Sequence, residues 1–234
     1  MNMIRIGDPV QRDEDLRFLR GRGRYQDDVD ALHQARAYVL RSPLAHADIR
    51  AIDTSAASKA PGVLAILTGD DLKARGLGNI KPNFAGKRSD GSPGFATPQP
   101  LLAQGRVRYA GEGVAFVVAE TVEQAKDAAE LVEVDYAPLP SLNSVDDALA
   151  PGALALWDDN PGNEAYTHEI GDAAAVDAAF SKAAHVIRHR VCVSRVACNA
   201  LETRGCLATY DDMEDRYELR ATVQSVHGMR QQIA

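Results

Sequence analysis

The chain is poor in cysteine and aromatic residues and has no long apolar run. Its 234 residues include 3 cysteines, 1 tryptophan and 6% aromatic residues in all. The cysteines are odd in number and none lies in a Cys-x-x-Cys pair, so neither a disulfide framework nor a compact zinc or iron–sulfur site is predicted. No apolar run approaches the roughly 18 residues that span a bilayer. The opening MNMIRIGDPV also lacks the apolar core of a signal peptide, and we therefore expect a cytoplasmic protein.

Common catalytic motifs are absent as well. The sequence has no Gly-x-Gly-x-x-Gly, no Walker phosphate loop around Gly21 and Gly23, and no Gly-x-Ser-x-Gly. A net charge of −7 argues against a nucleic-acid partner. His185 and His189 are four residues apart, but the alternating pattern around them predicts a strand. Four residues of strand span roughly 13 Å, too far for both side chains to bind one metal ion.

What the sequence does contain is typical of a mixed α/β fold of the α+β type. Hydrophobic residues make up 45% and charged residues 25%, as in ordinary globular proteins. Short apolar or alternating runs predict strands over 35–41, 62–67 and 113–119. Two aspartates in the first turn favour a helix over 69–75.

The segment that follows the third of these strands has the strongest local pattern. Thr121 and Gln124 form a capping box that predicts the start of a helix. A further strand, VEVDY, ends before Pro138. Strand, helix and strand of these lengths predict a compact crossover unit.

Two regions rich in loop-forming residues divide the chain. Residues 76–100 contain many Gly, Pro, Asn and Ser residues, which predicts a long loop. That loop is either a mobile surface loop or an arm that contacts another subunit. Prolines and glycines also gather in 138–165, and we place a domain boundary there near residue 155. The predicted domains are therefore 1–155 and 156–234.

The C-terminal part alternates between helix and strand patterns. Asp172 is expected to cap a helix, and 185–197 is expected to form a strand. A hairpin should follow, with its turn in DDMED. Ser225 is expected to cap a last helix.

Three blocks of sequence resemble the large, molybdenum-binding subunit of the xanthine dehydrogenase, aldehyde oxidase and carbon monoxide dehydrogenase family. They are RFLRGRGRYQDDV at 17–29, a block at 41–72 with a Ser-Pro-x-Ala-His pattern, and VRYAGEGVAFVVAE and its continuation at 107–140. Gly113 stands where that family usually has proline. Residues 199–205 and 221–234 resemble parts of the start of the family's molybdopterin-binding domain.

The resemblance implies a hammerhead-type α/β domain followed by the start of a molybdopterin-binding α/β domain. It also implies that the chain is the N-terminal portion of the large subunit of an oxidoreductase. Such an enzyme hydroxylates an aldehyde or heterocycle, or oxidises carbon monoxide, with water as the oxygen source. The molybdenum–pyranopterin cofactor (molybdopterin) belongs to the intact enzyme, and [2Fe–2S] clusters and FAD to partner subunits or domains. No cofactor is expected in this chain alone.

Partners implied by the resemblance are the remainder of the large subunit and the iron–sulfur and flavin subunits, and the assembly could be a homodimer. Neither nucleic acid nor a membrane is expected as a partner. The Arg-Gly-Arg-Gly-Arg-Tyr opening favours the bacterial three-subunit enzymes. Carbon monoxide, aldehydes, purines and N-heterocycles all stay open as substrates. The alternative is a non-catalytic module for subunit docking or scaffolding.

Gln224 is the one residue to which the resemblance assigns a cofactor-binding role. In Thr-x-Gln-x-x-His it aligns with the family's glutamine near the apical oxo ligand of molybdenum. A carboxamide offers two N–H donors and adds no charge. Glu202 lies in a family-like Leu-Glu-Thr-Arg-Gly motif, where an ion pair with Arg204 is favoured over catalysis. No catalytic residue and no metal ligand is assigned, and the chain alone is expected to be inactive because the family's general base lies beyond it.

Overall fold

The computed structural model describes residues 7, 9, 12–82, 86–194 and 196–233. It shows a mixed fold of helices and sheets, which confirms the predicted class. The described residues contain no helix that is long and apolar enough to cross a membrane.

The chain forms two compact units. We call Gln34–Arg188 the central unit, and Met1–His33 together with His189–Ala234 the terminal unit. Each is described by itself below.

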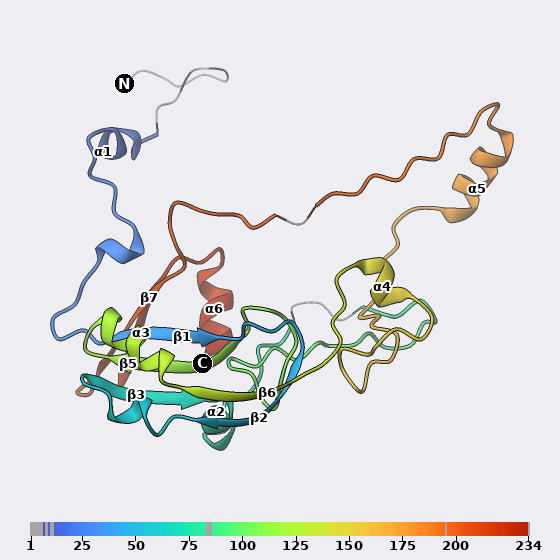
Figure 1. Ribbon diagram of the computed structural model, residues 1–234. Coiled ribbons are helices and arrows are strands. Elements are labelled where there is room, and N and C mark those ends of the chain that lie inside the picture. Colours follow the sequence, from blue (N-terminus) through green and yellow to red (C-terminus); the bar gives the residue numbers. More distant parts are fainter. Residues whose placement is uncertain (1–6, 8, 10–11, 83–85, 195, 234) are drawn as a thin grey trace. The chain divides into compact units, whose positions relative to one another are not determined.

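The first sheet of the central unit has the strand order β1-β5-β3, with every pair antiparallel. The strands are β1 (Arg36–Arg41), β5 (Gly113–Ala119) and β3 (Val63–Thr68). All three lie where the apolar runs predict them, within one residue. The most apolar of the three, β5, takes the middle position (Figure 1).

The second sheet has the order β4-β2-β6 and is also antiparallel. Its strands are β4 (Arg106–Val107), β2 (Ala47–Asp53) and β6 (Glu133–Pro138). The predicted crossover unit is therefore wrong, because β5 and β6 lie in different sheets. β6 pairs instead with β2, a long-range partner that local periodicity cannot reveal.

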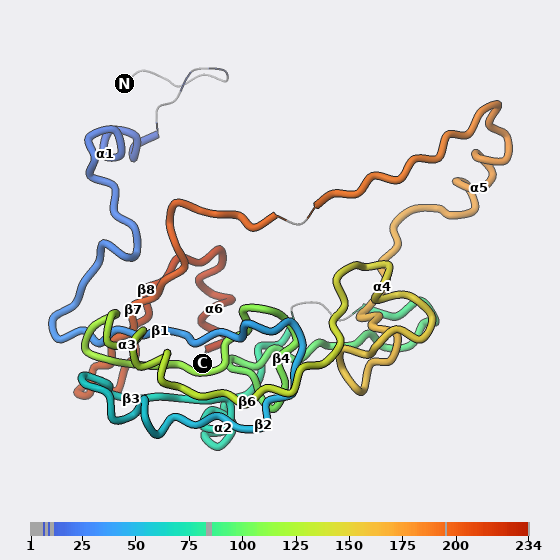
Figure 2. The backbone as a smooth tube through the Cα atoms, viewed as in Figure 1, coloured from blue at the N-terminus to red at the C-terminus, as the bar shows by residue number. Residues whose placement is uncertain are grey.

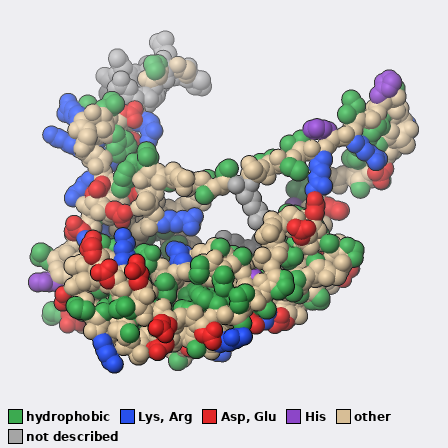
Figure 3. All heavy atoms as spheres, viewed as in Figure 1, with side chains coloured by type: hydrophobic (Ala, Val, Ile, Leu, Met, Phe, Trp, Pro, Cys, Tyr) green, Lys and Arg blue, Asp and Glu red, His purple; other side chains and the backbone are tan. Residues whose placement is uncertain are grey.

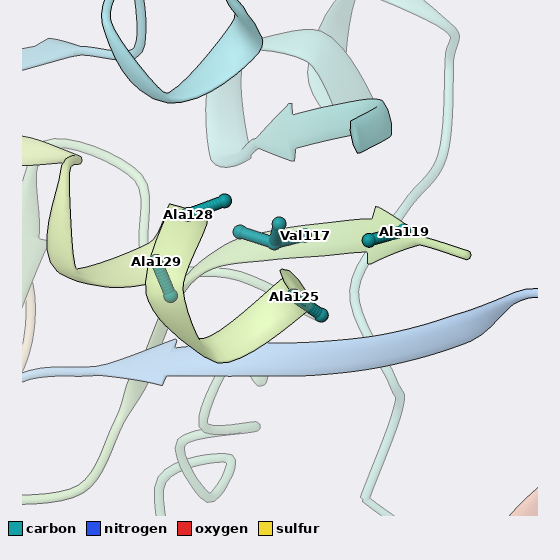
Figure 4. Packing of buried hydrophobic residues seen from close by; sticks show 5 residues of the cluster. All are labelled: Val117, Ala119, Ala125, Ala128 and Ala129. Carbon is teal, nitrogen blue, oxygen red and sulfur yellow. The ribbon is translucent and has the colours of Figure 1, made fainter. Parts of the chain in front are cut away.

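Helix α3 (Val122–Glu130) packs on the first sheet through small side chains. Ala125, Ala128 and Ala129 form a buried cluster with Val117 and Ala119 of β5 (Figure 4). The predicted capping box is confirmed. The Thr121 side chain accepts a hydrogen bond from the Gln124 backbone N–H, and the Gln124 side chain accepts one from Thr121.

A second cluster lies on the other face of β5. Val114 joins Ala47, Ala103 and Val107 there. Successive side chains of a strand point to opposite faces, so β5 supplies Val114 to one core and Val117 to the other. The middle strand thus contributes to both buried clusters of the central unit.

Shorter elements complete the central unit. Helix α2 (Gly69–Ala74) occupies the predicted position, and Thr68 and Asp71 form a second capping box at its start. The remaining elements are the 3₁₀ turn η2 (Ala57–Lys59) and the helices α4 (Val145–Leu149) and α5 (Ala173–Lys182). Asp172 caps α5 as predicted, since its carboxylate accepts the Ala175 N–H at 2.9 Å.

The expected strand over 185–197 is not formed by the described residues. These residues are exposed and extended, without a neighbouring strand, on both sides of residue 195, which lies outside the described part (Figure 2). A strand is stabilised by backbone hydrogen bonds to a neighbouring strand, and none of the strands in the described part of the chain pairs with this segment.

The terminal unit holds α1 (Asp15–Leu19), the 3₁₀ turn η1 (Gln26–Asp28), an antiparallel hairpin and α6 (Val226–Ile233). The hairpin pairs β7 (Cys206–Asp211) with β8 (Arg216–Ala221), as predicted (Figure 1). The Ser225 hydroxyl accepts the Gly228 N–H at 3.2 Å, which confirms the expected cap. No described residue of this unit is buried.

Candidate functional site

Gln224 lies in the connection between β8 and α6. Its side chain is exposed, and no hydrogen bond of its carboxamide is found among the described residues. The next residue, Ser225, is used by the helix, since its carbonyl accepts the Met229 N–H at 3.0 Å. The start of α6 therefore fixes the backbone beside Gln224. The two N–H donors of the Gln224 carboxamide stay available to a ligand.

Glu202 has a different partner from the one expected. Its carboxylate accepts the backbone N–H of Gln26 at 3.1 Å. Next to it, the Thr203 hydroxyl donates to the Asp27 carboxylate at 2.7 Å. No Glu202–Arg204 ion pair occurs within the described ranges, so that expectation was wrong. The carboxylate is instead hydrogen-bonded to η1, so Glu202 links the segment before β7 to the N-terminal part of the chain.

A surface cavity of about 620 Å³ lies beside this link in the terminal unit. The peptide around it is folded on itself: the Asp28 carboxylate accepts the Tyr25 N–H at 2.8 Å, and the Arg24 guanidinium donates to the Asp28 carbonyl at 3.3 Å. Charges of both signs line the cavity, which does not favour an anion or a cation. Its lining residues are Arg17, Phe18, Gly21, Gly23, Arg24, Tyr25, Asp28 and Glu202.

A second hollow in the terminal unit, of about 740 Å³, runs between β8 and α6. We call it the β8–α6 groove. Most of the surface that lines it is apolar, and Gln224 is not among its lining residues. The lining residues are Gln26, Tyr217, Glu218, Leu219, Arg220, Ala221, Val223, Val226, Met229, Arg230 and Ile233.

The central unit contains a buried acid that the sequence patterns did not single out for a role. Glu112 is only 7% exposed, and its carboxylate accepts the Arg108 backbone N–H at 2.6 Å. Burial raises the pKa of Glu112, and the hydrogen bond and charge of Arg108 oppose the rise. Glu112 contacts the loop before β5 and lines neither of the two hollows, so its role is structural.

Two arginines of β4 and its flank hold the segment after α4. The Arg108 guanidinium stacks 3.6 Å from the centre of the Trp157 ring and donates to the Leu156 carbonyl at 3.2 Å. Arg106 bridges Asp48 at 2.6 Å and Asp158 at 2.9 Å. The hydrogen bond that the Arg106 guanidinium donates to the Asp48 carboxylate raises the pKa of Arg106. The region in which we placed the domain boundary is thus fastened to the second sheet.

The loop 76–100 docks on the same segment. Arg88 donates to the buried Asn160 at 2.9 Å, and the Glu164 carboxylate accepts the Ser89 N–H at 2.6 Å. Phe95 packs against Trp157 with the two rings tilted by 53° and their centres 6.1 Å apart. The described part of the loop is therefore an ordered piece of the central unit, and contact with another subunit stays a prediction.

Metal-binding side chains are not brought together. The described residues contain no group of three or more His, Cys, Asp or Glu side chains that could hold a metal ion. His185 and His189 are both exposed, and all three cysteines are exposed and free. His46 is buried just before β2, with its Nδ1 atom 2.7 Å from the carbonyl oxygen of Pro140, which follows β6.

Two protein-family models match this chain. Residues 20–140 match the family model described as the a/b hammerhead domain of aldehyde oxidase and xanthine dehydrogenase. The chain belongs to the aldehyde oxidase and xanthine dehydrogenase family. Residues 156–234 match the molybdopterin cofactor-binding domain, in the order that the resemblance implied. The boundary near residue 155 stays a prediction.

Relatives of known function within the family include large subunits. The nicotine 6-hydroxylase large subunit of Paenarthrobacter nicotinovorans is 40% identical over 224 residues, which are 95% of this chain and 26% of the relative. The carbon monoxide dehydrogenase large chain of Afipia carboxidovorans is 38% identical over 96% of this chain and 28% of its own. The chain thus spans about a quarter of the length of these relatives.

Solved structures of the family have the same fold. Carbon monoxide dehydrogenase from Oligotropha carboxidovorans superposes with a TM-score of 0.80 at 37% identity, over 97% of this chain and 28% of that chain. Quinoline 2-oxidoreductase from Pseudomonas putida 86 gives a TM-score of 0.81 at 33% identity, with the same coverage of 97% and 28%.

Proposed function

We propose that this chain supplies the hammerhead domain and the first part of the molybdopterin-binding domain to the large subunit of a molybdenum hydroxylase. The observation that carries the proposal is the pair of family matches, in order, over 20–140 and 156–234. The intact enzyme hydroxylates an aldehyde or heterocycle, or oxidises carbon monoxide, with water as the oxygen source. Aldehydes, purines, N-heterocycles and carbon monoxide all remain candidate substrates.

Gln224 fits a cofactor-facing role. It is exposed, it lies just before α6, and its carboxamide has no hydrogen bond among the described residues. A neutral donor can orient an oxygen-bearing cofactor without changing the charge of the site. When bound, the molybdenum–pyranopterin group supplies the two-electron redox chemistry. The contribution of this chain is to hold and orient that group through Gln224.

The general base comes from elsewhere in this proposal. Glu112 is buried against Arg108, and Glu202 is engaged by Gln26. We assign the role of general base to neither carboxylate. We therefore expect the chain alone to be inactive.

The partners of the proposed enzyme are the remainder of the large subunit and subunits or domains that carry [2Fe–2S] clusters and FAD. The names of the relatives support this, since they include large chains and the gamma subunit of a 6-hydroxypseudooxynicotine dehydrogenase complex. A cytoplasmic location and a paired assembly complete the proposal.

A second candidate function is a docking or scaffold module without a cofactor role. The observation that favours it is the exposure of large apolar side chains in the terminal unit, including Leu201, Tyr217 and Val226. Apolar side chains also reach the surface in many other places on the face shown in Figure 3. Large apolar patches on a surface are common at protein–protein contacts.

Molybdenum analysis of the native assembly separates the two functions. We expect molybdenum to copurify with the chain, and Gln224→Ala to lower turnover about 10- to 100-fold, the usual range for a residue that orients a metal site. Gln231→Ala, in the exposed part of α6, is the matched control. An assembly without molybdenum, or a Gln224→Ala enzyme as active as the control, would favour the scaffold function.

A further inference from the structure

The β8–α6 groove is open and apolar. The exposed fractions of Val226, Ile233 and Leu219 are 70%, 62% and 41%. Residues of β8 line one side of the groove and residues of α6 line the other. Helix α6 and the hairpin lie side by side in Figure 1. Apolar surface of this kind costs free energy while it faces water.

One face of α6 carries all four of its groove residues. Val226, Met229, Arg230 and Ile233 follow one another at spacings of three, one and three residues, which places them along one side of a helix. Gln231 is exposed and does not line the groove. The helix therefore presents an amphipathic face to whatever fills the groove.

The charges at the rim are unequal. Glu218 and Arg220 are paired at 2.8 Å, and this contact lowers the pKa of Glu218. Arg230 has no ion pair within the part of the chain that the structure describes. The rim therefore offers one basic group to an incoming carboxylate.

We propose that the β8–α6 groove holds an amphipathic segment of the polypeptide that completes the molybdopterin-binding domain. The apolar face of that segment covers Val226, Met229 and Ile233, and a carboxylate on it pairs with Arg230. This inference rests on the proposed function, because the occupant is the rest of the large subunit. The matched relatives contain enough polypeptide for such a segment, since they are roughly three to four times as long as this chain.

The terminal unit itself argues for a permanent occupant. None of its described residues is buried, so it has no core of its own. A two-stranded hairpin or a helix of eight residues is marginal in water without packing. A unit built in this way needs a continuously bound partner, which a continuation of the same domain provides and a transient partner does not.

Photo-crosslinking in the native host identifies the occupant. Val226→p-benzoylphenylalanine places the probe in the groove, and Met213→p-benzoylphenylalanine, at the exposed hairpin turn, is the control. We expect mass spectrometry to find the groove crosslink on a polypeptide that matches the remainder of the relatives' large subunits, and not from the control position. A crosslink to a second copy, to an iron–sulfur or flavin subunit, or to nothing overturns the proposal.

Charged substitutions test the same contact without a probe. Val226→Asp with Ile233→Asp should lower the amount of assembly retained on the chain about tenfold, because the new carboxylates would be buried in an apolar contact. Gln231→Asp adds a charge to the same helix outside the groove and should have no effect. Both groove positions are exposed in the chain alone, so its far-UV circular dichroism should stay unchanged. If the double variant and the Gln231→Asp variant retain equal amounts of the assembly, the proposal is contradicted.

The molybdenum content of the unmodified assembly is measured separately. A molybdenum-free assembly with the expected crosslink would refute the proposed cofactor role but leave the groove assignment in place. A molybdenum-containing assembly without that crosslink would refute the groove assignment but leave the proposed cofactor role in place.

Discussion

The central and terminal units differ in how they are stabilised. Every buried residue of the described chain lies between Ser42 and Asn160, inside the central unit. That unit has two apolar clusters that share strand β5. The terminal unit has a hairpin and a helix around an open groove. The comparison teaches that the central unit is stabilised by its own buried cores, whereas the described part of the terminal unit has no buried residue and gains no stability from a core.

The largest difference between the units should come from a charge placed in each. Val117→Asp buries a carboxylate between β5 and α3 and should cost about 4 kcal/mol or more, enough to unfold the central unit. Val193→Asp changes an exposed residue of the terminal unit and should leave the free energy of unfolding within about 0.5 kcal/mol of wild type. Urea denaturation measures both. Similar losses would mean that the terminal unit has a core after all.

A smaller effect is expected at the arginine that fastens the segment after α4. Arg108→Met removes the stacking on Trp157 and the hydrogen bond to Leu156, and should cost about 2 kcal/mol. Arg50→Met removes an exposed ion pair with Asp135, with the charged atoms 3.8 Å apart, and should cost less than about 0.5 kcal/mol. Limited proteolysis near Trp157 should speed up in the first variant alone. Equal losses of stability would contradict this role of Arg108.

Removal of a helix cap should affect stability differently in the two units. Thr121→Ala removes a cap from the packed helix α3 and should lower the free energy of unfolding by about 1 kcal/mol. Ser225→Ala removes the corresponding bond from α6. Because α6 has no buried residue, we expect local fraying, seen as a slight loss of helical circular dichroism, and no change in global unfolding. A global loss from Ser225→Ala would show that α6 is part of the cooperative fold.

The smallest effect concerns the pH dependence of the central unit. Burial raises the pKa of Glu112 above its ordinary value of 4.5, so the folded state binds this proton more tightly than the unfolded state. The stabilisation from this group is fully present below pH 4.5 and is lost as the pH rises through the folded-state pKa. Glu112→Gln keeps an uncharged acceptor for the Arg108 N–H. Its stability should therefore fall less than that of wild type between pH 4.5 and pH 7.5 in urea titrations. An unchanged pH dependence would contradict the account.

Local patterns predicted the central unit's elements well because each has a nearby chemical cause. The capping box of Thr121, the apolar run of β5 and the Asp172 cap all act within a few residues, and all were found. The partition into two sheets was missed because β6 pairs with β2, some eighty residues away in sequence. The docking of the 76–100 loop on Asn160 and Glu164 was missed for the same reason.

The candidate site was less predictable. The alternating pattern of 185–197 is typical of a strand, but a strand forms only where another strand pairs with it. Glu202 was expected to pair with a near neighbour and instead contacts Gln26, at the other end of the chain. Gln224 came from family resemblance alone, since an exposed polar residue before a helix has no pattern that distinguishes it. Its role stays a prediction.

Amide hydrogen exchange on the isolated chain tests the contrast between the two units most directly. We predict that the amides of β5 and α3, which surround the buried Val117 cluster, are protected for hours, whereas those of β7, β8 and α6 exchange within seconds to minutes. Equally strong protection in both units would contradict the account, because it would show that the terminal unit is stably folded without a partner.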